Sequence, residues 1–382
     1  MFATPSQELL LRSALFSGEK AINAWMEWKE QTDLQAEMDM GSFRLLPVVY
    51  KNLRLLNVED AWMGRLKGIY RLTWYKNQAL FRVATNVLQG LDQAQIPTLI
   101  LKGAPLALEY YQDLGVRPMN DFDILVPPAQ RDKAIEIILK AGWAPMLSQN
   151  NTFTQEIKMV RHAWGFVNPS GQSIDLHWRV FALSSENETD DLAWEKSIPI
   201  TVNAIQTRTI NPTDMLLHVC VHGGQWDISS SIRWIVDAMF IIRKAQHSIQ
   251  WEHLVEQAEN RRFILPLRLA LTYLYDQFQA PIPENTLSQL NHLVVSPIEM
   301  KLFKTIASKP TLFGNLPTYW YKYLHQLERR GQEINISSML NFINYLQQVK
   351  GIHSKVELMD WAFRRTLLRL GRFLGGVDQA FP

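Results

Sequence analysis

The feature that most constrains the fold of this chain is the stretch of residues 98–126, which reads TLILKGAPLALEYYQDLGVRPMNDFDILV. It opens with a short apolar run that ends at Lys102 and Gly103. It closes with Asp121 and Asp123, which run into a second apolar run, ILV. The pattern predicts a strand, a tight turn, a helix, a loop and a second strand. This arrangement places a Lys-Gly turn beside two carboxylates.

The two acidic residues of the second strand are expected to share one face of the sheet. Side chains alternate along a strand, so Asp121 and Asp123 point the same way while Phe122 points into the protein. Their charges repel each other across roughly 7 Å, given a rise of about 3.3 Å per residue. A divalent cation offsets such repulsion, and Mg2+ prefers carboxylate oxygens together with substrate phosphates. The alternative is a solvated strand end that binds no metal.

A later segment of the chain also has the pattern of a strand with one polar face. After a turn of Asn-Pro-Ser-Gly composition, residues 172–180 alternate between apolar and polar positions. Asp175 and His177 fall on the polar face of this strand.

Taken together, these residues resemble a known family. In order along the chain, the matching residues are Lys102, Gly103, Arg117, Asp121, Asp123 and Asp175. They are similar to the KG…R…DxDxLV and DLHW patterns of a poorly characterised bacterial nucleotidyltransferase family, which belongs to the DNA polymerase β-like superfamily. The resemblance covers roughly residues 43–243 and is strongest over 99–126 and 173–179.

The resemblance implies an α+β fold. A polymerase-β-like nucleotidyltransferase core, with a small mixed sheet and helices, would be flanked by N- and C-terminal helical segments. It also implies an enzyme of the EC 2.7.7 type that moves an NMP from an NTP, such as ATP, to an unidentified acceptor and releases pyrophosphate. Two Mg2+ ions, with Mn2+ as the alternative, would lie about 3.5–4 Å apart. The acceptor candidates are a small molecule, a protein and a tRNA end.

The resemblance further implies roles for the matching residues. The catalytic and metal-binding residues would be Asp121, Asp123 and Asp175. The nucleotide-binding residues would be Lys102, Gly103, Arg117 and His177. Asp175 would also help to remove the acceptor proton.

Each nucleotide-binding residue has an alternative interpretation. Gly103 allows close approach of a phosphate, to which Lys102 would add charge, but the pair also suits an ordinary strand-to-helix turn with a solvated lysine. The wider superfamily commonly has Gly-Ser here, which leaves open how the triphosphate is gripped. Arg117 would pair with phosphate or hold the carboxylates in place. His177 would orient Asp175, contact a substrate or satisfy a buried hydrogen bond.

The helical pattern around the core suggests three regions. Residues 1–95 form an N-terminal helical region that ends in a long helix over 59–95, whose C-terminal half would pack on the sheet. Residues 96–210 form the nucleotidyltransferase core, which includes a strand pair near its end. Residues 211–382 form a C-terminal helical domain interrupted near its prolines and Gly331.

Two polar clusters lie in the C-terminal region. His218 and His222 share one side of a helix, but they lack the glutamate of an H-E-x-x-H zinc motif. We interpret His222, Arg233 and Asp237 as a polar network lining the cleft, the alternative being a packed helix pair.

A basic helix near the end of the given sequence would bind RNA, an acidic partner or a membrane surface, or would simply be solvated. Its arginines are Arg364, Arg365, Arg369 and Arg372.

Composition narrows the class of protein. The net charge of +2 disfavours a large nucleic-acid footprint. The single cysteine, Cys220, leaves no internal disulfide and favours a reducing compartment. No apolar run approaches 18 residues, so we expect a cytoplasmic protein with no membrane partner. Two other functions stay open: a catalytically silent nucleotide-binding regulatory protein, and a helical interaction protein with an incidental Asp-x-Asp.

Overall fold

The computed structural model describes residues 2–33, 38–146, 161–181, 190–225, 232–308, 315–352 and 354–364. The chain forms two compact units. The first comprises Met1–Met146, Ala163–Phe181 and Thr189–Val294. The second comprises Leu147–His162, Ala182–Glu188 and Val295–Pro382. The division of the sequence into regions 1–95, 96–210 and 211–382 stays a prediction.

The first unit begins with helices. They are α1 (Pro5–Leu15), α2 (Gly18–Gln31), α3 (Met40–Phe43), α4 (Leu46–Leu55) and α5 (Met63–Gln93). Helix α1 begins with a capping box, in which Thr4 and Gln7 satisfy each other's backbone N–H groups. The buried side of α5 recurs at helical spacing, as the sequence predicts. Its buried residues include Leu66, Thr73, Asn77, Leu80, Ala84, Val87 and Leu91.

A seven-stranded mixed sheet follows, in the order β3-β4-β5-β2-β1-β7-β6. Its strands are β1 (Leu99–Leu101), β2 (Asp121–Leu125), β3 (Ala144–Pro145), β4 (Ala163–Val167), β5 (Ser173–His177), β6 (Ile198–Val202) and β7 (Ile205–Thr209). Strand β2 runs antiparallel to β1 and parallel to β5. Strands β6 and β7 form the predicted pair. The structure therefore confirms an α+β fold with a mixed sheet and flanking helices.

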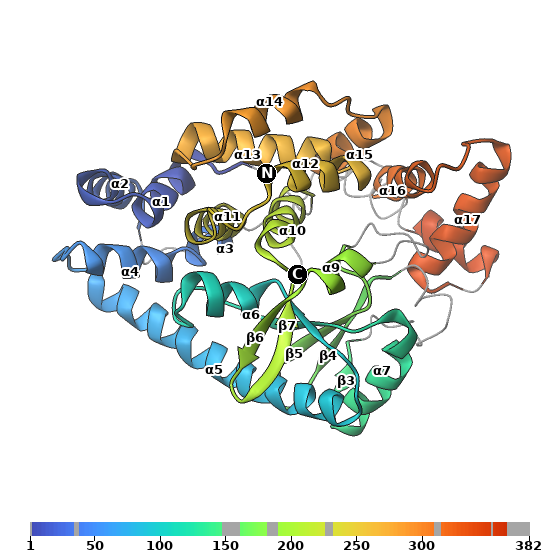
Figure 1. Cartoon of the computed structure of the whole chain (residues 1–382), viewed down its shortest axis with the longest axis horizontal. Helices are drawn as coiled ribbons and strands as arrows, with labels where there is room; N and C mark the ends of the chain where they lie inside the picture. Colours follow the sequence, from blue (N-terminus) through green and yellow to red (C-terminus); the bar gives the residue numbers. More distant parts are fainter. Residues whose placement is uncertain are drawn as a thin grey trace. The chain divides into compact units, whose positions relative to one another are not determined.

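Helices cover both faces of this sheet (Figure 1). On one face, Phe81 of α5 packs edge-on against Phe122 of β2, with ring centroids 5.3 Å apart. Helices α10 (Pro212–Gln225) and α11 (Arg233–Lys244) lie on the other side, toward which the acidic residues of β2 point. The elements between β1 and β3 are α6 (Gly103–Pro105), the π-helix η1 (Leu106–Tyr111), the 3₁₀ turn η2 (Pro128–Gln130) and α7 (Arg131–Lys140). The remaining helices of this unit are α9 (Asp191–Glu195), α12 (Trp251–Asn260), α13 (Ile264–Phe278) and α14 (Glu284–His292).

The second unit is helical where it is described. It contains α15 (Pro297–Ala307), α16 (Leu316–Arg329) and α17 (Ile336–Lys350). Its core joins Tyr323 and Leu327 of α16 to Phe342 and Tyr345 of α17. Of the C-terminal arginine cluster, Arg364 pairs with Asp360. Its other members, Arg365, Arg369 and Arg372, lie outside the described residues.

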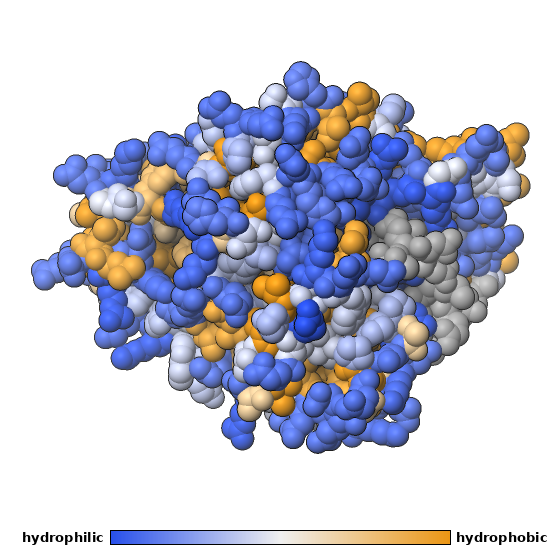
Figure 2. Space-filling model, viewed as in Figure 1, coloured by the Kyte–Doolittle hydropathy of each residue, from blue (hydrophilic) through white to orange (hydrophobic). Residues whose placement is uncertain are grey.

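Hydrophilic residues cover most of the molecular face seen in Figure 2, with hydrophobic residues in scattered groups between them. This distribution agrees with the burial of apolar side chains in the core. Within the described part of the chain, no helix is long and apolar enough to cross a membrane.

Candidate active site

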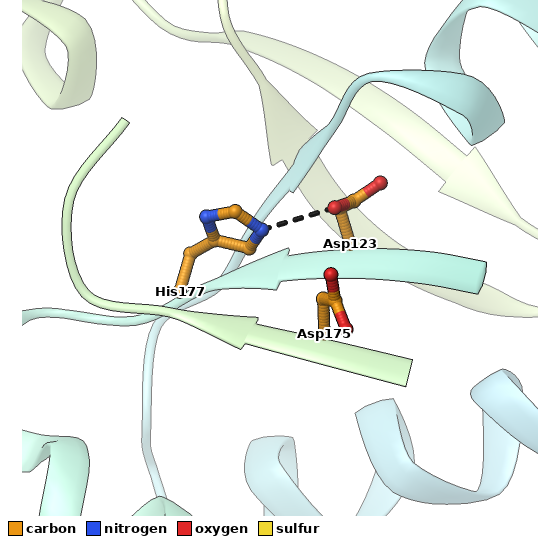
Figure 3. Close-up of side chains that lie close together, drawn as sticks. All are labelled: Asp123, Asp175 and His177. Carbon is orange, nitrogen blue, oxygen red and sulfur yellow. Dashed lines mark hydrogen bonds and ion pairs between the residues drawn. The ribbon is translucent and has the colours of Figure 1, made fainter. Parts of the chain in front are cut away.

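Strands β2 and β5 bring the acidic residues together. In their parallel register, Asp123 lies opposite Asp175, and Asp121 lies opposite Ser173. The side chains of Asp123 and Asp175 project from neighbouring strands toward the same side, and the ring of His177 reaches Asp123 (Figure 3). The alternation of side chains that predicts a shared polar face therefore also sets the spacing of these groups.

Asp123 is the most tightly held of the three acids. It is 2% exposed, and its Oδ1 lies 3.0 Å from His177 Nε2 and 2.5 Å from Lys102 Nζ. Burial alone would raise the pKa of Asp123, but the Lys102 ammonium and the His177 hydrogen bond outweigh it and hold the pKa well below its usual value. Burial lowers the pKa of His177, and the Lys102 charge lowers it further, which favours a neutral imidazole.

The Lys102-Gly103 turn adopts an unusual backbone. Lys102 has φ +51° and ψ −112°, the geometry of the first central residue of a type II′ turn, where glycine is the rule. Such a conformation costs about 1–3 kcal/mol in a non-glycine residue. At Gly103, an added Cβ would lie 2.7 Å from Arg117 Nη1 and 2.8 Å from Met119 Sδ. The turn is therefore strained at Lys102 and closely packed at Gly103.

Asp121 and Asp175 carry charges that the protein does not neutralise by direct contact. Burial, followed by the charges of Asp123 and Asp121, raises the pKa of Asp175 to about 6. Burial and the charge of Asp123 likewise raise the pKa of Asp121. Neither carboxylate forms an ion pair with another described residue. Both line a cleft of about 360 Å³ in the first unit.

The acids suit a divalent cation. Of the described residues, only Asp123, Asp175 and His177 bring three potential ligand atoms within 4.8 Å of one another. Asp121 lies outside this close group but on the same strand face. Carboxylate oxygens are the ligands that Mg2+ prefers, and a cation would relieve the repulsion that raises the pKa of Asp175. The donor set of these residues therefore fits such an ion.

Arg117 is held by a partner from the helical side. Its Nε and Nη2 donate to the two oxygens of Asp237 at 2.8 and 2.9 Å, and Tyr111 Oη donates to Asp237 Oδ1 at 2.7 Å. All three side chains are buried. The guanidinium therefore bonds neither Asp121 nor Asp123, although it lies beside the Lys-Gly turn.

Helices α10 and α11 form the opposite wall of the cleft. His218 and His222 of α10 and Arg233 of α11 line it, as does Asp237. Burial lowers the pKa of His218 well below its usual value, which favours a neutral ring. Arg44, between α3 and α4, also reaches the cleft. Sequence reasoning missed Arg44, because a single arginine in an apolar helical segment carries no motif.

Two comparisons with known proteins found similar sequences or structures. Residues 41–279 match a family model described as "Uncharacterised nucleotidyltransferase". No curated protein sequence matches the chain. A solution structure of the antibiotic-resistance factor ANT(2'')-Ia aligns over 53% of this chain and 96% of its own, with 11% identity and a TM-score of 0.33. An antigenic nucleotidyltransferase-like protein from Paracoccidioides brasiliensis aligns over 57% of this chain and 94% of its own, with 15% identity and a TM-score of 0.32.

Proposed function

The chain belongs to this family of uncharacterised nucleotidyltransferases, and from that premise we propose that it moves an NMP from an NTP to an acceptor and releases pyrophosphate. One observation carries the proposal: Asp121, Asp123 and Asp175 lie on one face of two adjacent strands, in a cleft that also contains a Lys-Gly turn. In-line transfer needs groups that hold both the acceptor oxygen and the triphosphate. Carboxylates and a phosphate-binding turn are such groups.

Asp123 and Asp175, with Asp121 beside them, would hold Mg2+ or Mn2+. When bound, the ion supplies positive charge for the transferring phosphate and makes an acceptor hydroxyl more acidic. The observation that supports this assignment is geometric: Asp123 and Asp175 lie opposite each other on adjacent strands, and together with His177 they bring three potential ligand atoms within 4.8 Å of one another.

The protein's own groups would share the remaining tasks. Asp175 lines the cleft beside Asp123 and forms no ion pair with another described residue, which supports a role in taking the acceptor proton. His177 is fully buried on Asp123, which supports a role in orienting that carboxylate. Lys102 neutralises Asp123 in the absence of nucleotide, and its ammonium would exchange that contact for a β- or γ-phosphate.

The test follows the label of an NTP. Protein is incubated with Mg2+, a cell extract as a source of acceptors, and NTP labelled on either the α- or the γ-phosphate. The proposal predicts that the α-label moves to an acceptor while the γ-label appears in pyrophosphate. Asp123→Asn should abolish both while the chain still folds, although its melting temperature should fall because Lys102 loses its ion-pair partner. Asp92→Asn, which removes an exposed acid from the end of α5, is the matched control and should behave as wild type.

Two results would contradict this assignment. Full transfer by a folded Asp123→Asn variant would remove that carboxylate from the reaction. Tight NTP binding by the wild type, with no transfer to any acceptor, would instead favour a catalytically silent nucleotide-binding protein.

A further inference from the structure

Only some of the charged side chains that line the cleft form close ion pairs with one another. Lys102 is matched by Asp123, and Arg117 is matched by both oxygens of Asp237. Four charged groups that line the same cleft are left over. Two are the carboxylates of Asp121 and Asp175, and two are the guanidiniums of Arg44 and Arg233.

Arg233 has less than its full complement of partners. Its Nη1 donates to Pro118 O at 2.6 Å. Its Nε lies 3.9 Å from Asp237 Oδ2, beyond hydrogen-bond distance, because Arg117 already occupies that carboxylate. This Nε is buried and makes no hydrogen bond. The side chain as a whole is 20% exposed, so it remains open to the cleft.

Arg44, which lies between α3 and α4, lines the same cleft as Arg233. It is half-buried, and its guanidinium has no hydrogen bond or ion pair with any residue in the described part of the chain. A single carboxylate, Asp237, thus faces the guanidiniums of Arg117 and Arg233, and Arg44 lines the same cleft. Burial lowers the pKa of Arg233 to about 10, and the charges of Arg117 and Arg44 add to this effect. Such crowding of like charge would be relieved by an anion.

We propose that Arg44 and Arg233 form a polyphosphate-binding site for the terminal phosphates of the NTP and for the pyrophosphate that leaves. This inference rests on the proposed function, because it names the part of the substrate that the helical wall binds. A guanidinium can donate two parallel hydrogen bonds to two oxygens of one phosphate, and its positive charge strengthens both bonds. Asp237 is a positioning residue, since it fixes Arg117 next to the Lys-Gly turn.

A single ligand could neutralise both the unpaired carboxylates and the unpaired guanidiniums of the cleft. The metal ion of a metal-polyphosphate would place positive charge near Asp121 and Asp175, and its phosphates would place negative charge near Arg44 and Arg233. The cleft therefore carries the charge complement of one substrate that contains both.

The experiment titrates inorganic pyrophosphate into the full-length chain in EDTA, using calorimetry. Arg44→Gln and Arg233→Gln should each weaken binding roughly ten- to hundredfold, because each removes charge-assisted hydrogen bonds. Arg54→Gln is the matched control: it removes an exposed arginine from α4 with the same change in charge, and it should bind as wild type does. Because Arg44 forms no hydrogen bond or ion pair with the residues that the structure describes, its variant should fold normally, and melting curves will show this.

Three results would overturn the inference. They are an absence of pyrophosphate binding by the wild type, wild-type affinity in folded Arg44→Gln and Arg233→Gln, and simultaneous binding of pyrophosphate and NTP. The last result would assign the arginines to a phosphate on the acceptor instead. Pyrophosphate binding in EDTA needs neither metal nor acceptor. If it is observed without nucleotidyl transfer, the proposed function fails while the anion site stands.

Discussion

Replacing Asp175 by asparagine should make the metal-free protein more stable. Burial and the charges of Asp123 and Asp121 raise the pKa of Asp175 from 3.8 to about 6, so its ionised form is disfavoured in the folded state. Asparagine keeps the shape of the side chain and removes the charge. The carboxylate therefore destabilises the fold at neutral pH, which is the behaviour expected of a group kept for function.

The size of the effect follows from the shift in pKa. A shift of about 2 units, at 1.36 kcal/mol per unit, sets an upper value of about 3 kcal/mol. Partial exposure of Asp175 to solvent reduces it, so we expect about 1–2 kcal/mol. Because the pKa of Asp175 is higher in the folded state, its carboxylate does not destabilise the fold below pH 3.8. The loss of stability grows as the pH rises from 3.8 to about 6, and it stays constant at higher pH.

Urea denaturation in EDTA, followed by circular dichroism, measures this difference. At pH 8, Asp175→Asn should unfold at higher urea than wild type, and the gap should shrink as the pH falls from about 6 toward 4. Asp92→Asn, the exposed control, should show no gap at any pH. A variant that is no more stable than wild type at pH 8, or a gap that does not depend on pH, would refute the reasoning.

The buried contacts of the site give two further predictions, both measured by urea denaturation. Asp237→Asn should lower the free energy of unfolding by about 3–5 kcal/mol, because it leaves the Arg117 charge buried and unpaired; a loss below about 1 kcal/mol would contradict this. Gly103→Ala should cost about 1–3 kcal/mol because its Cβ would overlap Arg117. Gly68→Ala in α5, where a Cβ meets nothing within 4 Å, should instead gain about 0.5–1 kcal/mol. Equal effects at the two glycines would show that packing at Gly103 is unimportant.

Local patterns in the sequence predicted the elements that build the sheet and its covering helix. The alternation in residues 172–180 predicts the strand that contains Asp175, and the helical spacing over 59–95 predicts α5. Both depend on neighbours in sequence, since each pattern follows from the geometry of one element. The acidic face of β2 could be predicted for the same reason.

Features that depend on tertiary packing could not be predicted. Arg117 and Asp237 are 120 residues apart, and only the docking of α11 beside η1 brings them together. The positive φ of Lys102 is equally hidden, because nothing in a Lys-Gly sequence indicates a conformation that glycine would favour. Arg44 belongs to the cleft only through the packing of the N-terminal helices.

Calorimetric titration of the four NTPs into the wild type and into an Asp121→Ala/Asp123→Ala double variant, with and without Mg2+, tests the central claim most directly. We expect Mg2+-dependent binding of at least one NTP to the wild type and its loss in the double variant, with both proteins folded. Equal binding by the two proteins, or binding that ignores Mg2+, would contradict the assignment of these carboxylates to a metal-nucleotide site.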